Sequence, residues 1–313
     1  MKKISIVIPT YNRLEVLKSC VFSIVNQDFN SADYEIIIVD NGPSNDGTDI
    51  FIAEIIKTRK NIFYFQRKEK GCIFARNFGF QEAKGEILLT VDDDVEFLGR
   101  DCLTILAHTF EDKDVGMVGS VELHGNKDEV STVKSCKNIN LNKIGRVTKW
   151  GSFYASFNQL DGYDDLVVVD HFRSCFMAVR ADLFNAVGGF DAKYNADGMG
   201  FRYETDLCMR VKNLAKKVVI NPKIRIWHKV AKRSRGFERG KGNRYLFLVS
   251  RNHMYFMLKF FWHKHRWFWF VYDFLIGAYR TPGLLFLLKR RELSWANLVC
   301  VFRGKLSGLS FLK

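Results

Sequence analysis

The first hundred residues contain four short, mostly apolar runs, and this pattern constrains the fold more than any other feature of the sequence. The runs are Ile4–Ile8, Glu35–Val39, Ile62–Gln66 and Glu86–Val91. Runs without regular polar alternation are typical of strands that are buried on both faces, and the segments between them carry helical patterns. This alternation predicts an α/β fold, with a mostly parallel sheet, right-handed crossovers and helices on both faces.

Polar residues follow three of these runs, at the point where each strand is expected to end. They are Thr10–Asn12 after the first run, Asp40–Asn41 after the second and Asp92–Asp94 after the fourth. Open α/β sheets bind their ligands outside the carboxyl ends of the strands. We therefore expect these three groups to meet at one edge of the sheet and to form a site.

The three consecutive acids Asp92, Asp93 and Asp94 are the most informative group in the chain. Three adjacent carboxylates repel one another, so packing alone gives no reason for them. A divalent cation such as Mg²⁺ or Mn²⁺ would relieve that repulsion and prefers oxygen ligands. The alternative is a solvated acidic turn, and the position after a buried strand favours the metal site.

Two carboxylates and one histidine in the second half are further candidates. Glu204 and Asp206 stand at the start of an expected helix, where the alternative role is a favourable interaction with the helix dipole. Because they are two positions apart, they face different sides of that helix. Two short strands are expected at 218–220 and 224–227. His228 follows the second of them, and it is either a ligand of a metal or phosphate or a structural residue.

The segment 229–244 reads KVAKRSRGFERGKGNR, and its cations and glycines predict a loop. Lys232, Arg233 and Arg235 are close enough in sequence to bind a phosphate group together. The alternative is a solvated loop without a ligand.

The net charge of +14 is unevenly distributed. Residues 1–206 carry a net charge of −7, whereas residues 207–313 carry +21. A strongly basic third is typical of proteins that contact nucleic acid, anionic lipid or a phosphorylated substrate. No recognisable nucleic-acid-binding module is present, so we expect no nucleic-acid partner.

Residues 245–286 hold 15 aromatic side chains in 42 positions, interleaved with lysine and arginine. Asp273, Arg280 and Lys289 interrupt every run that approaches the length of a membrane span. Aromatic residues mixed with cations are typical of a helix at the level of lipid headgroups. The sequence therefore predicts attachment to an anionic membrane surface, the alternative being that these aromatics pack against the rest of the protein or a second subunit.

The chain shows no sign of export. Its seven cysteines are scattered without a C-x-x-C pair, which is typical of reduced thiols. The first apolar run ends at Pro9 and no cleavage motif follows, which favours a strand over a secretion signal. We expect a cytoplasmic protein that is peripheral at the cytoplasmic face of a membrane.

Five motifs, taken together and in this order, resemble the family 2 glycosyltransferases, which are inverting enzymes of the GT-A fold. The motifs are SIVIPTYNR at 5–13, IIIVDNGPSNDGT at 36–48, ARNFGFQEAKGEILLTVDDD at 75–94, CFMAVRADLFNAVGGFD at 175–191 and YETDLCMRVKNLAKKVVINP at 203–222. The resemblance covers about residues 1–255. It implies a GT-A catalytic domain over 1–244, followed by a helical, aromatic and basic region over 245–313.

The resemblance also implies roles for individual positions. The candidate residues of the nucleotide-sugar site are Pro9, Thr10, Asp40, Asn41, Arg76, Asp92 and Asp93. The cations of the basic segment, Lys232, Arg233 and Arg235, complete this set. The metal ligands of Mg²⁺ or Mn²⁺ fall on Asp92, Asp94 and His228. Glu204 falls where the family places its catalytic base, usually an aspartate after a glutamate; here Tyr203 precedes Glu204, so Asp206 is the other candidate.

These roles imply transfer of a sugar from a nucleotide-diphosphate sugar, with a UDP-sugar favoured. The acceptor is expected to be a hydroxyl group of a glycan or of a lipid-linked molecule in the synthesis of cell-surface polysaccharide or glycoconjugate. The alternative with the same chemistry but another acceptor is a polyprenyl-phosphate sugar synthase. In that reaction a phosphate group attacks in place of a hydroxyl group, and no base is needed. A non-catalytic nucleic-acid-binding protein is the alternative from a different class.

Overall fold

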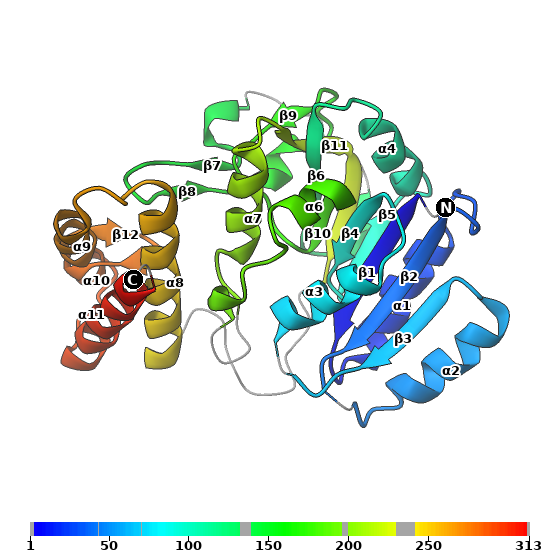
Figure 1. The fold of residues 1–313 in the computed structure, drawn as a ribbon, viewed down its shortest axis with the longest axis horizontal. Helices are drawn as coiled ribbons and strands as arrows, with labels where there is room; N and C mark the ends of the chain where they lie inside the picture. Colours follow the sequence, from blue (N-terminus) through cyan, green and yellow to red (C-terminus); the bar gives the residue numbers. More distant parts are fainter. Residues whose placement is uncertain are drawn as a thin grey trace.

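The computed structural model shows one α/β body with a group of helices at one side (Figure 1). It describes residues 3–42, 44–69, 71–131, 139–195, 200–229 and 242–311. The strands of the main sheet are β1 (Ile4–Thr10), β2 (Tyr34–Asp40), β3 (Ile62–Gln66), β4 (Ile87–Val91), β5 (Val95–Leu98), β6 (Val115–Leu123), β9 (Val167–Val168), β10 (Phe176–Arg180) and β11 (Lys217–His228). The short pairs β7 (Arg146–Val147) with β8 (Phe153–Tyr154) and β12 (Gly277–Ala278) with β13 (Thr281–Pro282) lie outside it.

The helices follow the expected alternation through the first half of the chain. They are α1 (Leu14–Val25), α2 (Thr48–Thr58), α3 (Cys72–Glu82), α4 (Cys102–Thr109), α5 (Lys127–Ser131), α6 (Ala181–Ala186), α7 (Tyr203–Lys212), α8 (Asn243–Phe260), α9 (Arg266–Leu275), α10 (Leu284–Lys289) and α11 (Trp295–Ser310). Three single turns of 3₁₀-helix complete the described secondary structure.

The sheet has the strand order β3-β2-β1-β4-β10-β6-β11-β5, with β9 paired to β11. Neighbours are parallel from β3 to β4 and again between β6 and β11, whereas β10, β5 and β9 run antiparallel to their partners. The prediction of a mixed α/β fold with a mostly parallel central sheet is confirmed. The carboxyl ends of β1, β2, β4, β6 and β11 therefore lie at one edge.

The sheet is buried on both faces because its strands carry apolar side chains at successive positions. In β1, Ile6 and Ile8 point into a core shared with α1, α2 and α4, whereas Val7 points into a core shared with α3, α6 and α7. Successive side chains of a strand alternate between the two faces, so an uninterrupted apolar run needs helices on each. The first-half runs thus place the helices where the sequence predicts them.

The segment after residue 217 departs from the prediction of two short strands. It forms one strand, β11, whose pairing with β6 shifts between Ile220 and Arg225. Pro222 lies in this interval and has no N–H group to donate to a neighbouring strand. The interruption that we expected is therefore an irregularity within a single long strand.

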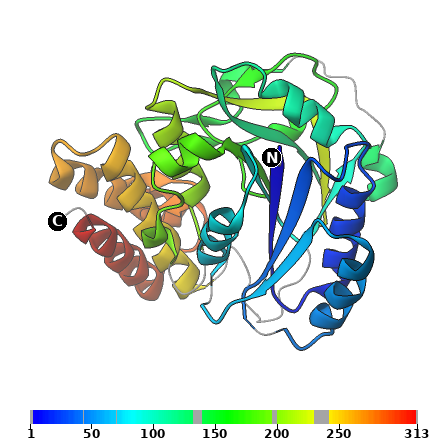
Figure 2. The ribbon, with the colours of Figure 1, turned by 45° about the vertical axis from the view of Figure 1, so that its right-hand side comes forward.

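The C-terminal helices lie on the side of the molecule opposite β1–β3, as both views of the ribbon show (Figures 1 and 2). Helix α8 belongs to the same apolar core as the sheet, to which it contributes Met254–Leu258. The amide of Asn252 donates to the carbonyls of Tyr194 and Phe201 at 2.9 and 3.1 Å. Helix α8 thus joins the C-terminal helices firmly to the α/β body. Among the described helices, none has the length and hydropathy needed to cross a membrane.

Candidate active site

Five strand ends bring polar side chains to one edge of the sheet. Thr10 ends β1, Asp40 ends β2, Glu122 lies one residue before the end of β6 and His228 ends β11. The acids at positions 92–94 follow β4 directly. The structure therefore brings together side chains that are separated by more than 200 residues along the chain.

Asp93 is buried and is held by one residue at the end of β1 and one just after it. The hydroxyl of Thr10 donates to Asp93 Oδ2 at 2.8 Å, and Arg13 Nη1 donates to Asp93 Oδ1 at 2.6 Å. Burial raises the pKa of Asp93 to about 7, although Arg13 opposes that shift. Thr10 and Asp93, which we predicted as nucleotide-sugar ligands, thus contact each other in this structure.

Asp92, Asp94 and His228 form a group that fits a divalent cation. Their ligand atoms all lie within 4.8 Å of one another. Asp94 Oδ1 is 3.2 Å from His228 Nε2, and Asp92 is the most exposed of the three acids. Two carboxylates and one imidazole make a donor set that suits Mn²⁺, and Mg²⁺ through the oxygen atoms.

Arg13 is a site residue that the sequence reasoning missed. Its Nη2 atom donates to Asp94 Oδ2 at 2.5 Å, while its Nη1 atom binds Asp93. The guanidinium group therefore bridges two members of the acidic triplet and offsets their repulsion. In the sequence, Arg13 could have been recognised as a cation that directly follows the polar residues Thr10–Asn12 after the first strand.

Arg76 links the acidic triplet to helix α7. Its Nε donates to Thr90 Oγ1 at 3.0 Å, and its Nη2 forms an ion pair with Asp92. The guanidinium also lies over the ring of Tyr203, 5.5 Å from its centroid. Tyr203 is the first residue of α7 and was not predicted as a site residue, yet it places the first turn of α7 beside the acidic triplet.

Asp40 and Asn41 lie at the end of β2. Asp40 is fully buried and accepts hydrogen bonds from Ser44 Oγ and Tyr64 Oη, both at 2.8 Å. Burial raises its pKa above the usual value of an aspartate, and these two hydrogen bonds oppose the shift. The side chain of Asn41 accepts a hydrogen bond from the Gly71 N–H at 3.1 Å. Pro9, which precedes Thr10 in β1, pairs with Val39 of β2.

The two candidate bases have different surroundings. Glu204 is partly exposed in the first turn of α7. Asp206 is fully buried and forms ion pairs with Arg210 and with Lys259 of α8, both at 2.6 Å. The hydroxyl of Tyr194 also donates to Asp206 at 3.1 Å. Asp206 is thus a junction between α7 and α8.

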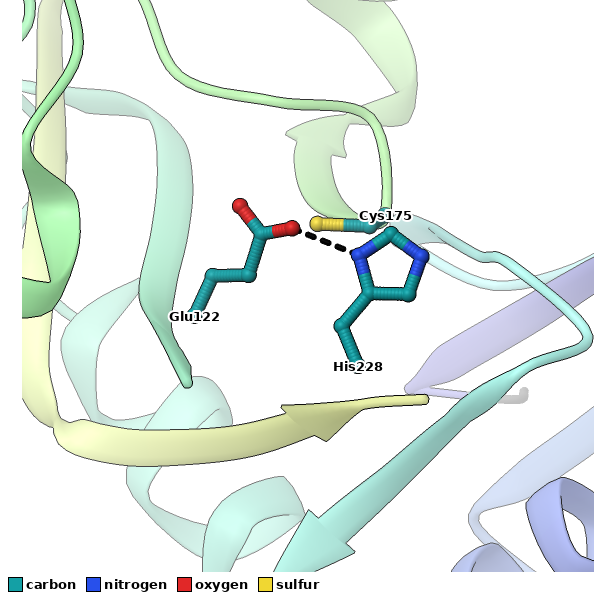
Figure 3. A group of neighbouring side chains, drawn as sticks. All are labelled: Glu122, Cys175 and His228. Carbon is teal, nitrogen blue, oxygen red and sulfur yellow. Dashed lines mark hydrogen bonds and ion pairs between the residues drawn. The ribbon is translucent and has the colours of Figure 1, made fainter. Parts of the chain in front are cut away.

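His228 lies between two carboxylates. Its Nδ1 is 2.5 Å from Glu122 Oε1 (Figure 3). Its other ring nitrogen, Nε2, is 3.2 Å from Asp94 Oδ1. Burial disfavours the charged ring, but its contacts with Asp94, Cys175 and Glu122 outweigh burial and raise the pKa of His228. Glu122 was not predicted from the sequence. Lys232, Arg233 and Arg235 lie outside the described residues.

The fold and the position of this group define an open-sheet α/β protein whose candidate site lies at the carboxyl ends of its strands, where such sheets bind their ligands. Residues 5–184 match the family model described as glycosyl transferase family 2, and the chain belongs to that family. The resemblance drawn from the sequence motifs is thereby confirmed.

Two bacterial relatives have names that describe specific transferases. The chain is 31% identical over 163 residues to a GalNAc(5)-diNAcBac-PP-undecaprenol beta-1,3-glucosyltransferase of Campylobacter jejuni, covering 50% of each protein. It is 34% identical over 97 residues to the poly(ribitol-phosphate) beta-N-acetylglucosaminyltransferase TarP of Staphylococcus aureus, covering 30% of this chain and 29% of that one. The matches thus span half or less of these relatives' own length.

Two solved structures share the fold. PcManGT, a mannosyltransferase of Pyrobaculum calidifontis solved with GDP-Man and Mn²⁺, has a TM-score of 0.56 at 16% identity, over 99% of this chain and 86% of that one. S. aureus TarS with UDP-GlcNAc has a TM-score of 0.63 at 14% identity, over 96% of this chain and 79% of that one. At these identities the comparison shows the shared GT-A fold.

Proposed function

We propose that this protein is an inverting glycosyltransferase, which moves a sugar from a nucleotide-diphosphate sugar to a hydroxyl group of a glycan or lipid-linked acceptor. The observation that carries the proposal is the group formed by Asp92, Asp94 and His228, with Arg76 beside it, at the edge where the strands end. A UDP-sugar is the favoured donor. TarS, which has the same fold, was solved with UDP-GlcNAc, and the C. jejuni relative is named for a lipid-linked acceptor.

The diphosphate of the donor is the leaving group, and its departure requires compensation of negative charge. A bound Mg²⁺ or Mn²⁺ would supply that compensation as a Lewis acid, held by Asp92, Asp94 and His228. Arg76 and Arg13 are cations already fixed at the same edge, where they can stabilise charge without reorganisation. The carboxyl of Asp40 and the amide of Asn41 would bind the nucleotide base at the end of β2.

We assign the base to Glu204, because its side chain is partly exposed in the first turn of α7, where the neighbouring Tyr203 ring contacts Arg76. A general base must take the proton of the acceptor hydroxyl as that oxygen attacks the anomeric carbon, on the face opposite the leaving diphosphate. Asp206 has no such access, since two cations and a tyrosine surround its buried carboxylate. Its role in this proposal is structural.

A donor screen tests the proposed reaction. We expect the full-length chain to release nucleotide from one class of nucleotide sugar in the presence of Mn²⁺ and an acceptor extract, and to stop when EDTA is added. The matched control is the same screen without acceptor. Absence of turnover with every UDP- and GDP-sugar, or undiminished turnover in EDTA, would contradict the proposal.

We further propose that helix α9 attaches the protein to an anionic membrane surface. The aromatic side chains of helix α9 differ in their exposure to solvent. Phe270 is buried, whereas the exposed fractions of Trp267 and Phe268 are 59% and 63%. Val271 continues this exposed face of α9, and Arg266 stands at its start.

Other aromatic side chains of the C-terminal region pack inward. Trp262 is buried, and its ring stacks on that of Trp269 with the ring centroids 5.1 Å apart. The exposed face of α9 suits the headgroup level of a bilayer, where each nearby cation adds about 1 kcal/mol.

We expect the 313-residue chain to float with anionic liposomes at low salt, and Trp267→Ser/Phe268→Ser to float much less. Point variants are preferable to truncation at Arg244, because truncation removes α8 from the core. Ile50→Ser is the matched control, since Ile50 is 69% exposed on α2, far from α9. Equal flotation of the double variant and the wild type, or no flotation of the wild type, would show that α9 does not bind lipid.

A further inference from the structure

Glu122 fixes the orientation of the His228 ring from the side opposite the acidic triplet. Glu122 Oε1 is 2.5 Å from Nδ1 (Figure 3). Asp94 Oδ1 is 3.2 Å from Nε2. A carboxylate accepts hydrogen bonds, so Nδ1 carries the hydrogen that faces Glu122. Nε2 is therefore the ring nitrogen that is directed toward Asp92 and Asp94.

Glu122 is itself held rigidly. It is 4% exposed in β6, and Arg173 Nη1 donates to its other oxygen, Oε2, at 2.6 Å. His124 Nε2 lies 3.2 Å from Oε1. The strands that carry the two residues are paired, with Glu122 opposite Ile226 of β11. A buried carboxylate with several partners cannot turn away without losing them, so its contact with His228 is fixed by the fold.

The neighbouring thiol of Cys175 lies within the same group as Glu122 and His228. A cysteine, a histidine and a glutamate are a donor set for a softer metal such as Zn²⁺. That site would need Nδ1 of His228 as its nitrogen ligand, and Glu122 already engages Nδ1. The geometry therefore favours a single metal on the Nε2 side.

We propose that Glu122 is a positioning residue of the metal site, which orients His228 as a nitrogen ligand and thereby gives the site a preference for Mn²⁺ over Mg²⁺. This inference rests on the proposed function of Asp92, Asp94 and His228. Mg²⁺ takes oxygen ligands and is demanding in its geometry, so a nitrogen ligand adds little to its binding. Mn²⁺ is a transition-metal ion and gains more from an oriented imidazole. Carboxylates that orient a ligating histidine typically affect metal affinity by about 10–100-fold.

The test measures Mn²⁺ binding to the full-length chain by electron paramagnetic resonance of free Mn²⁺, with Mg²⁺ affinity obtained by competition. Glu122→Leu should weaken Mn²⁺ binding by about 10–100-fold and change Mg²⁺ binding much less. Glu122→Gln retains an oxygen that accepts from Nδ1 and should keep most of the Mn²⁺ affinity. Adding His228→Ala to Glu122→Leu should cause less further loss than His228→Ala causes alone, because both changes act through one ring.

Glu35→Gln is the matched control, because Glu35 is another buried sheet carboxylate, bound to Ser5 Oγ at 2.6 Å and to the Lys84 N–H at 2.7 Å. It should leave Mn²⁺ affinity unchanged. If Glu122→Leu does not fold, Glu122→Asp replaces it: the charge beside Arg173 stays, but the shorter side chain no longer reaches Nδ1, and Mn²⁺ affinity should still fall.

The outcomes separate this inference from the proposed function. Wild-type Mn²⁺ affinity in a folded Glu122→Leu or Glu122→Asp variant, or equal losses for Mn²⁺ and Mg²⁺, would overturn the role of Glu122 alone. If Asp94→Ala binds Mn²⁺ as tightly as the wild type, the proposed metal site is wrong, and the proposed function that rests on it is contradicted.

Discussion

Replacing Asp94 by alanine should abolish sugar transfer while leaving the fold intact. The two oxygens of Asp94 face His228 and Arg13, at 3.2 and 2.5 Å, so this side chain connects the proposed cation to the end of β1. Loss of one preorganised electrostatic group typically costs about 10²–10³ in rate, and loss of the cation would add to it. Nucleotide release at saturating donor and Mn²⁺ measures the effect.

The fold should survive this change because Arg13 keeps its ion pair with Asp93. A thermal unfolding midpoint within a few degrees of the wild type would confirm that point. Asp28→Ala is the control, since Asp28 forms an exposed ion pair with Arg100 away from the site and should retain full activity. Chelator should inactivate the wild type to the level of Asp94→Ala. Turnover of a metal-free wild-type preparation at the normal rate would show that no cation takes part.

The sequence predicts the first four strands because each is a short, mostly apolar run, and three of these runs are followed by polar residues. It does not reveal β6, whose sequence VGMVGSVEL contains two glycines that interrupt its apolar run. Gly119 has a packing reason: a Cβ atom there would lie 2.6 Å from the ring of Phe172. Since β6 was missed, so was Glu122 near its end, and with it the partner of His228.

The polar contacts of the site were harder to predict than its location. The acidic triplet and His228 were recognisable because each follows a strand. Arg13 binds Asp93 and Asp94, which lie 80 and 81 positions further along the chain. The spacing of neighbouring residues in the sequence does not predict a contact over such a separation. Likewise the sequence placed Glu204 at the family's base position but kept Asp206 as the other candidate, because Lys259, the cation that pairs with Asp206, comes from a distant helix.

Replacing Glu204 by glutamine should lower the rate of transfer by about 10²–10⁴ with little change in donor affinity. Glutamine has nearly the same shape but cannot take a proton from the acceptor hydroxyl. Glu204 stands in the first turn of α7, and the neighbouring Tyr203 ring contacts Arg76, which pairs with Asp92. Steady-state rates with a hydroxyl acceptor, together with donor binding measured by calorimetry, separate the loss of a base from a loss of substrate.

Asp206→Asn provides the comparison that assigns the base. Because Asp206 is buried between Arg210 and Lys259, its neutral replacement should lower the thermal midpoint by leaving two cations with a weaker partner. We expect the opposite pattern for Glu204→Gln, a slow enzyme of normal stability. A larger rate loss in Asp206→Asn at unchanged stability would move the base to Asp206. Unchanged rates in both variants would mean that the attacking group arrives already ionised, as the phosphate of a polyprenyl-phosphate acceptor does, and the acceptor would then be reassigned to that class.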